Sequence, residues 1–259
     1  MIITTSRKPV AQLVQEAMEI GRRYGITYID RGNLSLSGLL DRYGAVLVLS
    51  RERLSCHTAA GELFFHPNMA AVRIKLMRQG KTDRMVRVMG LKPGDNVLDC
   101  TAGFCADSLV AQMAVGQQGR VVALEKSLPV YLVADHGLRH YSGPERLREL
   151  ARAIELRHAD FREYLEALPP GSFDVVYFDP MFSKPILEAA ALRPLRPLAF
   201  HRPLTREDIA LASRVARRRV VVKQHSSFDF AGLGLSLAPG SEDKKIAYGV
   251  LDIKESNDG

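Results

Sequence analysis

The chain has 259 residues and a formal net charge of +7, and 46% of its residues are hydrophobic while 25% are charged. At roughly 100–200 residues per domain, this length predicts one large domain or two smaller ones. No apolar run approaches the roughly 18 residues that a membrane helix needs, so we expect no membrane partner. The basic balance favours a polyanionic partner such as RNA or DNA, although many basic proteins bind neither.

The cysteine content points to a reducing compartment. Three cysteines are an odd number, which disfavours a disulfide framework, and Cys56, Cys100 and Cys105 lack zinc-ligand spacing. The segment Met1–Ser6 lacks the basic and apolar blocks of a secretory signal. We therefore expect a cytoplasmic protein without a bound metal.

The first part of the chain predicts a small α/β subdomain over residues 1–60. Short strand-like pieces alternate with segments whose apolar residues have helical spacing. The expected strands are Ile2–Thr5, Tyr28–Asp30 and Ala45–Leu49, and the expected helices are Val10–Tyr24 and Leu34–Arg42.

Residues 61–90 predict a helical bridge, with helices over Asn68–Gly80 and Thr82–Met89. In residues 91–259, β and α segments then alternate. The expected strands are Asn96–Cys100, Arg120–Leu124, Ile154–Arg157, Phe173–Phe178, Arg219–Lys223, Leu235–Ala238 and Ile246–Ile253. The helices expected between them are Asp107–Val115, Pro129–Tyr141, Pro144–Ala153 and Thr205–Arg217. This alternation predicts a doubly wound, seven-stranded Rossmann-like α/β sheet.

A nucleotide-binding βαβ unit is predicted where the first strand of this sheet ends. Asp99 ends the strand, Gly103 permits a tight turn, and a helix begins near Asp107, where free N–H groups of the helix N-terminus can face an anionic ligand group. Glu125 ends the next strand, where a carboxylate can accept hydrogen bonds from ribose hydroxyls. A dinucleotide fingerprint requires three glycines, so the single glycine argues against NAD. An ordinary βα turn is the alternative.

Asp160 and Phe161 follow the next strand of the sheet. Here an aspartate can accept a hydrogen bond from an adenine amino group, and the aromatic ring can pack on the base. A helix N-cap followed by a core phenylalanine explains the same pair equally well.

The turn Asp179-Pro180-Met181-Phe182 ends another strand and carries the predicted chemistry. An exocyclic amine on a base is a poor nucleophile because its lone pair is delocalised into the ring. The Asp179 carboxylate and the Pro180 carbonyl can accept its two hydrogens and orient the lone pair, while Phe182 can stack on the base. A strand-end turn that merely contains proline is the alternative.

These motifs resemble those of S-adenosylmethionine-dependent amino-group methyltransferases, and in particular the RsmJ-like class I family, which acts on guanine N2 in small-subunit ribosomal RNA. The resemblance covers roughly residues 62–253 and includes Gly61–Phe65, Asp99–Gly103, the DPMF turn and Val220–Lys223. It implies S-adenosylmethionine as cofactor. The cofactor contacts that it implies are Ala106, Asp107, Glu125, Lys126, Asp160, Phe161 and Asp179.

The chain departs from the family pattern at a few positions. Cys105 replaces a glycine, Ala106 and Lys126 each replace an arginine, and Ser183-Lys184 replaces Pro-His. Despite these changes we still expect the same fold and the same cofactor. The changes leave open which nucleotide of the RNA is methylated. Residues 1–54 separately resemble the opening of archaeal Brix-type ribosome-assembly proteins, which implies the same kind of partner.

The sequence therefore predicts an S-adenosylmethionine-dependent RNA methyltransferase whose partner is ribosomal RNA or the small ribosomal subunit. The residues expected to contact RNA are Arg73, Lys75, Arg78, Arg193, Arg196 and Arg202. A solvated basic helix and a proline-stiffened loop would explain the same residues. Two other functions stay open: methylation of protein, DNA or a small molecule, and a non-catalytic RNA-binding assembly factor.

Overall fold

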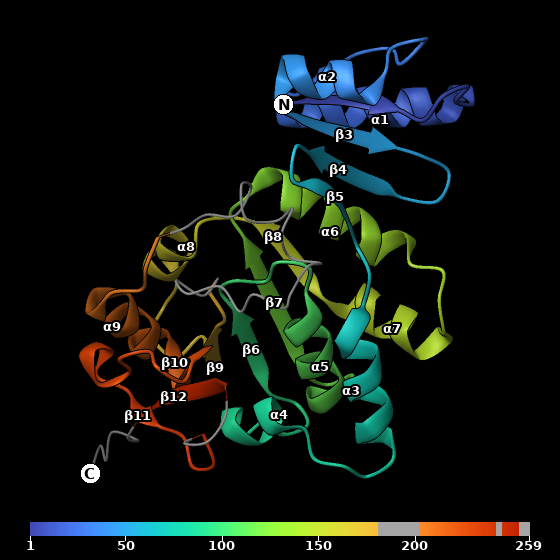
Figure 1. Cartoon of the computed structure of the whole chain (residues 1–259). Coiled ribbons are helices and arrows are strands. Elements are labelled where there is room, and N and C mark those ends of the chain that lie inside the picture. The colour runs from blue at the N-terminus through green and yellow to red at the C-terminus, as the bar shows by residue number, and fades with distance from the viewer. Residues whose placement is uncertain (181–201, 242–244, 254–259) are drawn as a thin grey trace. The chain divides into compact units, whose positions relative to one another are not determined.

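The computed structural model describes residues 1–180, 202–241 and 245–253, and its chain divides into two compact units (Figure 1). Among the described residues, the first unit contains 1–66 and 127–141, and the second contains 67–126, 142–180 and those after 201. From the sequence we predict that the N-terminal subdomain ends at residue 60. The first compact unit extends to His66 and also includes residues 127–141, which contain a helix much later in the chain.

The first unit is a five-stranded sheet of order β2-β1-β3-β4-β5. β1 is parallel to β2 and β3, whereas β3, β4 and β5 pair antiparallel. The strands are β1 (Ile2–Thr5), β2 (Thr27–Tyr28), β3 (Ala45–Leu49), β4 (Leu54–Thr58) and β5 (Gly61–Phe64). The helices are α1 (Ala11–Tyr24), α2 (Leu36–Tyr43) and α6 (Leu128–His140).

Strand alternation places the first two helices on opposite faces of this sheet. Ile2 and Val46 form a buried cluster with Leu39 of α2. The next residue, Ile3, faces the other way, where Gly21 of α1 lies against it and leaves no room for a larger residue beside the Ile26 carbonyl. The β-α-β-α-β pattern of the first 50 residues thus forms the elements that the sequence predicted.

Strands β4 and β5 were not predicted from the sequence. The sequence of β4, Leu54 to Thr58, alternates apolar and polar residues over only a short stretch and contains one large aliphatic side chain, and the polar residues Ser55 and Thr58 are buried together with Leu54 and Cys56. Both faces of β4 are covered, and β5 extends the sheet through Gly61–Phe64, where the sequence predicts the start of a helical bridge.

The second unit contains the predicted seven-stranded sheet, in the order β11-β12-β10-β9-β6-β7-β8. Its strands are β6 (Asn96–Asp99), β7 (Arg120–Glu125), β8 (Glu155–His158), β9 (Phe173–Phe178), β10 (Ala216–His225), β11 (Ser236–Leu237) and β12 (Ile246–Asp252). Its helices are α3 (Asn68–Arg78), α4 (Arg84–Met89), α5 (Ala106–Val115), α7 (Glu145–Ala153), α8 (Phe161–Ala167), α9 (Arg206–Val215) and the short 3-10 helix η2 (Ala231–Leu233).

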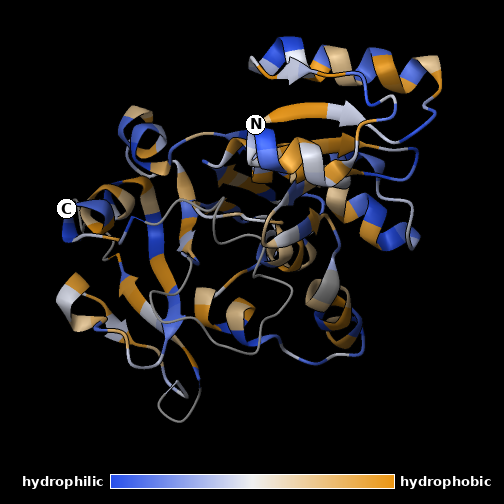
Figure 2. Ribbon diagram, turned by 45° about the horizontal axis from the view of Figure 1, so that its top comes forward, coloured by the Kyte–Doolittle hydropathy of each residue, from blue (hydrophilic) through white to orange (hydrophobic). Residues whose placement is uncertain are grey.

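The central strands are buried on both faces, as expected for a parallel sheet covered by helices. Val97, Val122, Val176 and Val221 have no exposed surface, and hydrophobic residues are concentrated in the strands (Figure 2). From β6 the chain proceeds outward through β7 and β8, then returns to β9 on the other side of β6. The carboxyl ends of β6 and β9 therefore meet at a switch point, where open α/β sheets bind ligands.

Most other predicted elements are confirmed with small shifts at their ends. The helix expected over Thr205–Arg217 ends at Val215, because β10 already begins at Ala216 and has a register irregularity before Arg219. The predicted capping box between Thr205 and Asp208 is present. Among the described residues, no helix combines the length and apolarity needed to span a membrane.

Candidate active site

The turn after β6 is organised by Asp99, whose carboxylate faces the protein interior. Its Oδ1 accepts a hydrogen bond from the Thr101 backbone N–H at 3.1 Å, and its Oδ2 accepts one from the Ser108 hydroxyl at 2.5 Å. The side chain is 3% exposed, and this burial raises the pKa of Asp99 to about 7. Both oxygens thus hold the protein's own turn and helix start in place.

Gly103 and Glu125 join the two strand ends that the sequence predicted to form the cofactor site. The backbone N–H of Gly103 donates to Glu125 Oε2 at 3.0 Å. Gly103 has φ of +52°, a region in which side chains are disfavoured. The carboxylate of Glu125 thereby lies beside the tight turn, at the sheet edge where ribose hydroxyls are expected.

Cys105 has a left-handed conformation, with φ of +58°. It caps the N-terminus of α5, and its side chain is fully buried. A glycine at this position, as in the family pattern, would adopt this conformation without strain. Cys105 therefore adopts a backbone conformation that the glycine of the family pattern would adopt more easily.

Asp160 and Phe161 form the structure that the alternative interpretation expected. Asp160 caps α8 by accepting from the Arg162 N–H at 2.9 Å, and its other oxygen pairs with Lys126. The Lys126 hydrogen bond lowers the pKa of Asp160, although burial opposes this effect. The ring of Phe161 packs edge-on against Phe178, with 5.3 Å between centroids. Adenine contacts by this pair stay a prediction.

The turn after β9 is attached to the turn after β6. The backbone N–H of Asp179 donates to the Thr101 hydroxyl at 2.6 Å, which fixes the start of the predicted catalytic turn. The Pro180 carbonyl accepts a hydrogen bond from the Gln224 amide at 3.4 Å and retains a second lone pair. Phe182, the predicted stacking residue, lies outside the described residues.

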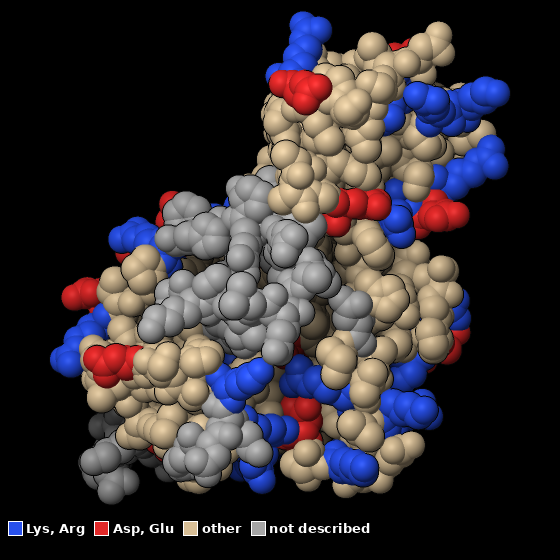
Figure 3. All heavy atoms as spheres, viewed as in Figure 1, with Lys and Arg blue, Asp and Glu red and all other residues tan. Residues whose placement is uncertain are grey.

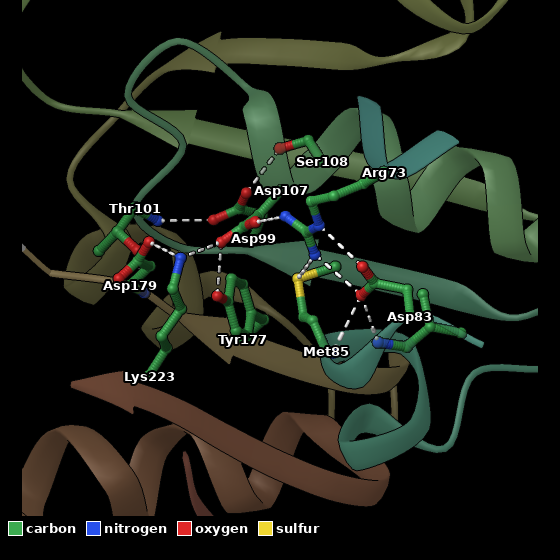
Figure 4. A network of polar contacts seen from close by, with 11 residues as sticks. Arg73, Asp83, Met85, Asp99, Thr101, Asp107, Ser108, Tyr177, Asp179 and Lys223 are labelled. Carbon is green, nitrogen blue, oxygen red and sulfur yellow. Dashed lines mark hydrogen bonds and ion pairs between the residues drawn. The ribbon is translucent and has the colours of Figure 1, made fainter. Parts of the chain in front are cut away.

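Polar side chains from several elements meet behind this turn (Figure 4). Lys223 on β10 places its Nζ 2.7 Å from Asp179 Oδ2 and 2.8 Å from Asp107 Oδ2. Asp107, in the first turn of α5, also accepts from the Tyr177 hydroxyl at 2.7 Å and from Arg73 Nη1 at 2.5 Å. The Asp107 side chain therefore holds other residues, and a cofactor contact would fall to its backbone N–H.

Arg73 extends the network to the start of α4. Its guanidinium donates to both oxygens of Asp83 at 2.8 and 2.9 Å, and Asp83 caps α4 through the N–H groups of Met85 and Val86. The network thus contains three carboxylates (Asp83, Asp107, Asp179) and two cations. Its formal charge of −1 favours a cationic ligand.

The two carboxylates that contact Lys223 have pKa values shifted in opposite directions. Burial raises the pKa of Asp179 to about 6, with a further contribution from Asp107 and an opposing one from Lys223. Burial would also raise the pKa of Asp107, but Lys223 and Arg73 outweigh it and lower that pKa. The pKa of Lys223 is raised, because Asp179 and Asp107 outweigh the opposing effect of burial. One carboxylate is thus firmly ionised, and the other titrates closer to neutrality.

Sequence reasoning found Asp107 and Asp179 but missed several of their partners. Lys223 was named only as the last residue of the Val220–Lys223 segment of the family resemblance. Tyr177 precedes Asp179 by two positions and so shares its side of the strand, a signal that could have identified it. The pairing of Arg73 with Asp107 joins α3 to α5, and nothing in the local sequence indicates it.

The predicted RNA-contacting residues fall into different environments. Lys75, Arg78 and Arg202 are exposed, whereas Arg73 is engaged with two carboxylates and is not available to bind RNA with its full charge. Arg193 and Arg196 lie outside the described residues. Lys and Arg side chains occur in several groups on the face shown in Figure 3, with acidic side chains between them.

The first unit contains a group of possible metal ligands, Glu16, His136 and His140, whose ligating atoms lie within 4.8 Å of one another. The two histidine rings are stacked, with 4.4 Å between centroids. The Leu54 N–H donates to His136 Nδ1 at 3.3 Å, so the neutral ring carries its proton on Nε2, 3.6 Å from Glu16 Oε1. A metal at Nε2 would have to displace that proton, so this geometry does not favour a metal.

Comparison with known families identifies the chemistry. The model of a family described as "Putative SAM-dependent methyltransferase" matches residues 36–232, more than half of the chain. The chain belongs to this family. The protein is an S-adenosylmethionine-dependent methyltransferase, and the cofactor predicted from the sequence is confirmed at this level.

Several relatives of this methyltransferase are known. The protein YpiP of Bacillus subtilis (strain 168) is 38% identical over 86% of this chain and 88% of its own length. The ribosomal RNA small subunit methyltransferase J of Laribacter hongkongensis is 33% identical over 56% of this chain and 52% of its own length. Its counterpart in Francisella philomiragia is 26% identical over 75% of this chain and 81% of its own length. The resemblance to Brix-type proteins stays a prediction.

The fold is also that of a solved structure, the SAM-dependent methyltransferase NGO1261 from Neisseria gonorrhoeae. Its TM-score is 0.68 at 17% sequence identity, and the match covers 99% of this chain and 98% of that one. The expected class of fold, a Rossmann-like methyltransferase sheet with an additional N-terminal α/β region, is therefore confirmed.

The donors and acceptors at the sheet edge fit S-adenosylmethionine. Glu125 offers a carboxylate for the ribose hydroxyls, the first turn of α5 offers backbone N–H groups for the methionine carboxylate, and the net negative network suits the positive sulfonium. Each of these residue assignments is a proposal for the methyltransferase. Asp99 would act through the turn that it holds.

Proposed function

We propose that this methyltransferase transfers a methyl group to an exocyclic amine of a base in ribosomal RNA, most specifically N2 of a guanine in the small subunit. The observation that carries the proposal is the position of Asp179. It follows β9 at the switch point of the sheet, its backbone is fixed by Thr101, and its carboxylate is held by Lys223.

The chemistry requires an amine to become nucleophilic. S-adenosylmethionine supplies an electrophilic methyl group when bound. The Asp179 carboxylate and the second lone pair of the Pro180 carbonyl accept the two N–H hydrogens, which favours a pyramidal nitrogen with its lone pair directed at the methyl group. The nitrogen must lose one proton as it gains the methyl group, and Asp179 is the acceptor within reach.

The RNA substrate is supported by two observations. Relatives that share 26–33% identity are named ribosomal RNA small subunit methyltransferase J. The chain also carries a net charge of +7, which favours a polyanion. A methyltransferase acting on carboxylates would not need an Asp–Pro turn arranged to accept amine hydrogens.

The proposal can be tested by analysing ribosomal RNA from a strain that lacks the gene. Nucleoside mass spectrometry should show loss of one N2-methylguanosine from the small-subunit RNA, and purified protein with labelled S-adenosylmethionine should restore it. An Asp179→Asn variant, which keeps the side-chain shape but lacks the carboxylate, is the matched control. Unchanged small-subunit RNA would overturn the choice of substrate, and cofactor binding without any transfer would favour an assembly factor.

A further inference from the structure

We propose that Lys223 is a positioning residue of the active site: it holds Oδ2 of Asp179 and thereby presents Oδ1 to the substrate amine. This inference rests on the proposed function, in which Asp179 accepts a hydrogen bond from that amine. It gives the contact between Lys223 and Asp179 a specific task in the proposed mechanism.

The geometry restricts Lys223 to this task. Its side chain is 16% exposed, and Val222 pairs with Phe178, so Lys223 stands beside the residue that follows β9. Two of its three N–H donors are directed to Asp179 and Asp107 at 2.7 and 2.8 Å. Within the described part of the chain, the donor that reaches the Asp179 carboxylate is this ammonium group, and its bond falls on Oδ2.

Lys223 is itself held from behind. Asp107 receives Arg73 on Oδ1 and Tyr177 on Oδ2, and Arg73 in turn grips Asp83. Carboxylates and cations therefore alternate from the start of α4 to the catalytic turn, as Figure 4 shows. A chain of mutually satisfied charges of this kind fixes each member in one orientation.

This arrangement decides which oxygen of Asp179 is available. The two oxygens of a carboxylate are chemically equivalent, so a mobile Asp179 would offer either one in any orientation. The ammonium group removes that freedom and leaves Oδ1 as the acceptor. The second lone pair of the Pro180 carbonyl provides the other acceptor, so the amine is oriented by two fixed oxygens.

Lys223 also counteracts the repulsion between two neighbouring carboxylates. The titratable and charged groups around Asp179 come from several packed elements and comprise Arg73, Asp99, Asp107, Tyr177, Lys223 and Tyr248. Among them the cation in contact with Asp179 is Lys223, whereas the nearby Asp107 raises the pKa of Asp179. Removal of the Lys223 charge should therefore favour protonation of Asp179, which could then no longer take up the proton that the amine releases.

The test is a direct titration of Asp179 that requires no substrate. The side-chain carboxyl carbon is followed by NMR in protein labelled with ¹³C-aspartate, and its resonance is assigned by its loss in Asp179→Asn. In Lys223→Met the pKa of Asp179 should rise by about 1–3 units, the usual effect of losing an adjacent opposite charge. Lys223→Arg keeps the positive charge, so the pKa of Asp179 in this variant should stay closer to the wild-type value. Lys92→Met, an exposed lysine in the turn before β6, is the matched control.

The pH dependence of methyl transfer provides the second measurement. In Lys223→Met the acid limb of kcat should shift upward with the pKa of Asp179, so that activity at pH 7 falls about 2–100-fold and recovers partly at higher pH. The KM for S-adenosylmethionine should change little. A loss that is equal at every pH, with lower thermal stability, would mean a purely structural lysine. If Lys223→Met does not fold, Lys223→Gln takes its place.

The outcomes separate this inference from the proposed function. An unchanged pKa of Asp179 in Lys223→Met overturns the role of Lys223, even if the wild type methylates ribosomal RNA. A raised pKa supports that role even if small-subunit RNA proves to be the wrong substrate, because the titration depends only on the protein.

Discussion

The backbone N–H of Gly103, in the turn after β6, donates a hydrogen bond at 3.0 Å to Oε2 of Glu125, the last residue of β7. One carboxylate oxygen of Glu125 thus holds the glycine turn in place. The other is the candidate acceptor for the ribose hydroxyls of the cofactor. These two roles can be separated by substitution.

Glu125→Ala should remove both roles and weaken S-adenosylmethionine binding by about 1–3 kcal/mol, since polar partners would be left unsatisfied. Glu125→Gln keeps one carbonyl oxygen for the Gly103 N–H but replaces the ribose acceptor with a donor. If the ribose contact dominates, calorimetric titration should show that Glu125→Gln loses about as much affinity for S-adenosylmethionine as Glu125→Ala does. A wild-type affinity in both variants would remove Glu125 from the cofactor site.

Asp179→Ala should abolish methyl transfer to RNA while the circular dichroism spectrum stays close to that of the wild type. The reason is that Asp179 follows the last residue of β9 and is not part of the apolar core, so the substitution removes no core packing, and Lys223 keeps its contact with Asp107. Single-turnover assays with labelled cofactor measure the loss. Transfer at the wild-type rate would contradict the mechanism.

Asp99 should make stability depend on pH. Its pKa is raised to about 7 in the folded protein from an ordinary value of 3.8, so folding favours the protonated form. The stability from this group is present below about pH 4 and is lost as the pH rises through about 7. Asp99→Asn imitates the protonated acid at every pH.

The variant Asp99→Asn should therefore gain stability relative to the wild type between pH 5 and pH 8, by at most about 1.4 kcal/mol per pH unit. Urea unfolding of both proteins at the two pH values gives this difference directly. A difference that does not change with pH would mean that Asp99 is ionised throughout.

Arg73→Ala should lower the free energy of unfolding by about 3 kcal/mol, because it leaves Asp83 and Asp107 without their shared partner. Arg73→Lys should not restore the loss, since a single ammonium group cannot reproduce the fork of the guanidinium. Arg78→Ala, on the exposed side of the same helix, is the control and should change stability by less than about 0.5 kcal/mol. Equal effects of Arg73→Ala and Arg78→Ala would contradict the buried role of Arg73.

Neutralising Arg193, Arg196 and Arg202 together should weaken RNA binding without changing S-adenosylmethionine affinity. The salt dependence should flatten by about one unit of slope per lost phosphate contact. Fluorescence anisotropy at several salt concentrations gives both values, with Arg152→Ala on α7 as a control. If the triple variant keeps the wild-type affinity and slope, the RNA surface lies elsewhere, with Lys75, Arg78 and the first unit as the next candidates.

The sequence by itself determined the class of fold and the parts of the site that are local. Alternating β and α segments predict a doubly wound sheet, and Asp99, Glu125 and Asp179 each end a strand of it. Because the carboxyl ends of parallel strands lie at one edge, their proximity follows from the pattern. The tight turn at Gly103 is equally local, since it depends on one residue's backbone freedom.

Only the tertiary structure decided how these residues are used. The strand β4 buries polar as well as apolar residues because both its faces are covered, and this burial depends on segments distant in sequence such as α6. Likewise Arg73, which looked like a surface cation, pairs with Asp107, and Lys223 reaches Asp179 across neighbouring strands. Charge pairing inside a protein depends on which side chains the fold brings within a few ångströms of each other and removes from water. The distance between two side chains in the folded protein cannot be read from their separation in the sequence.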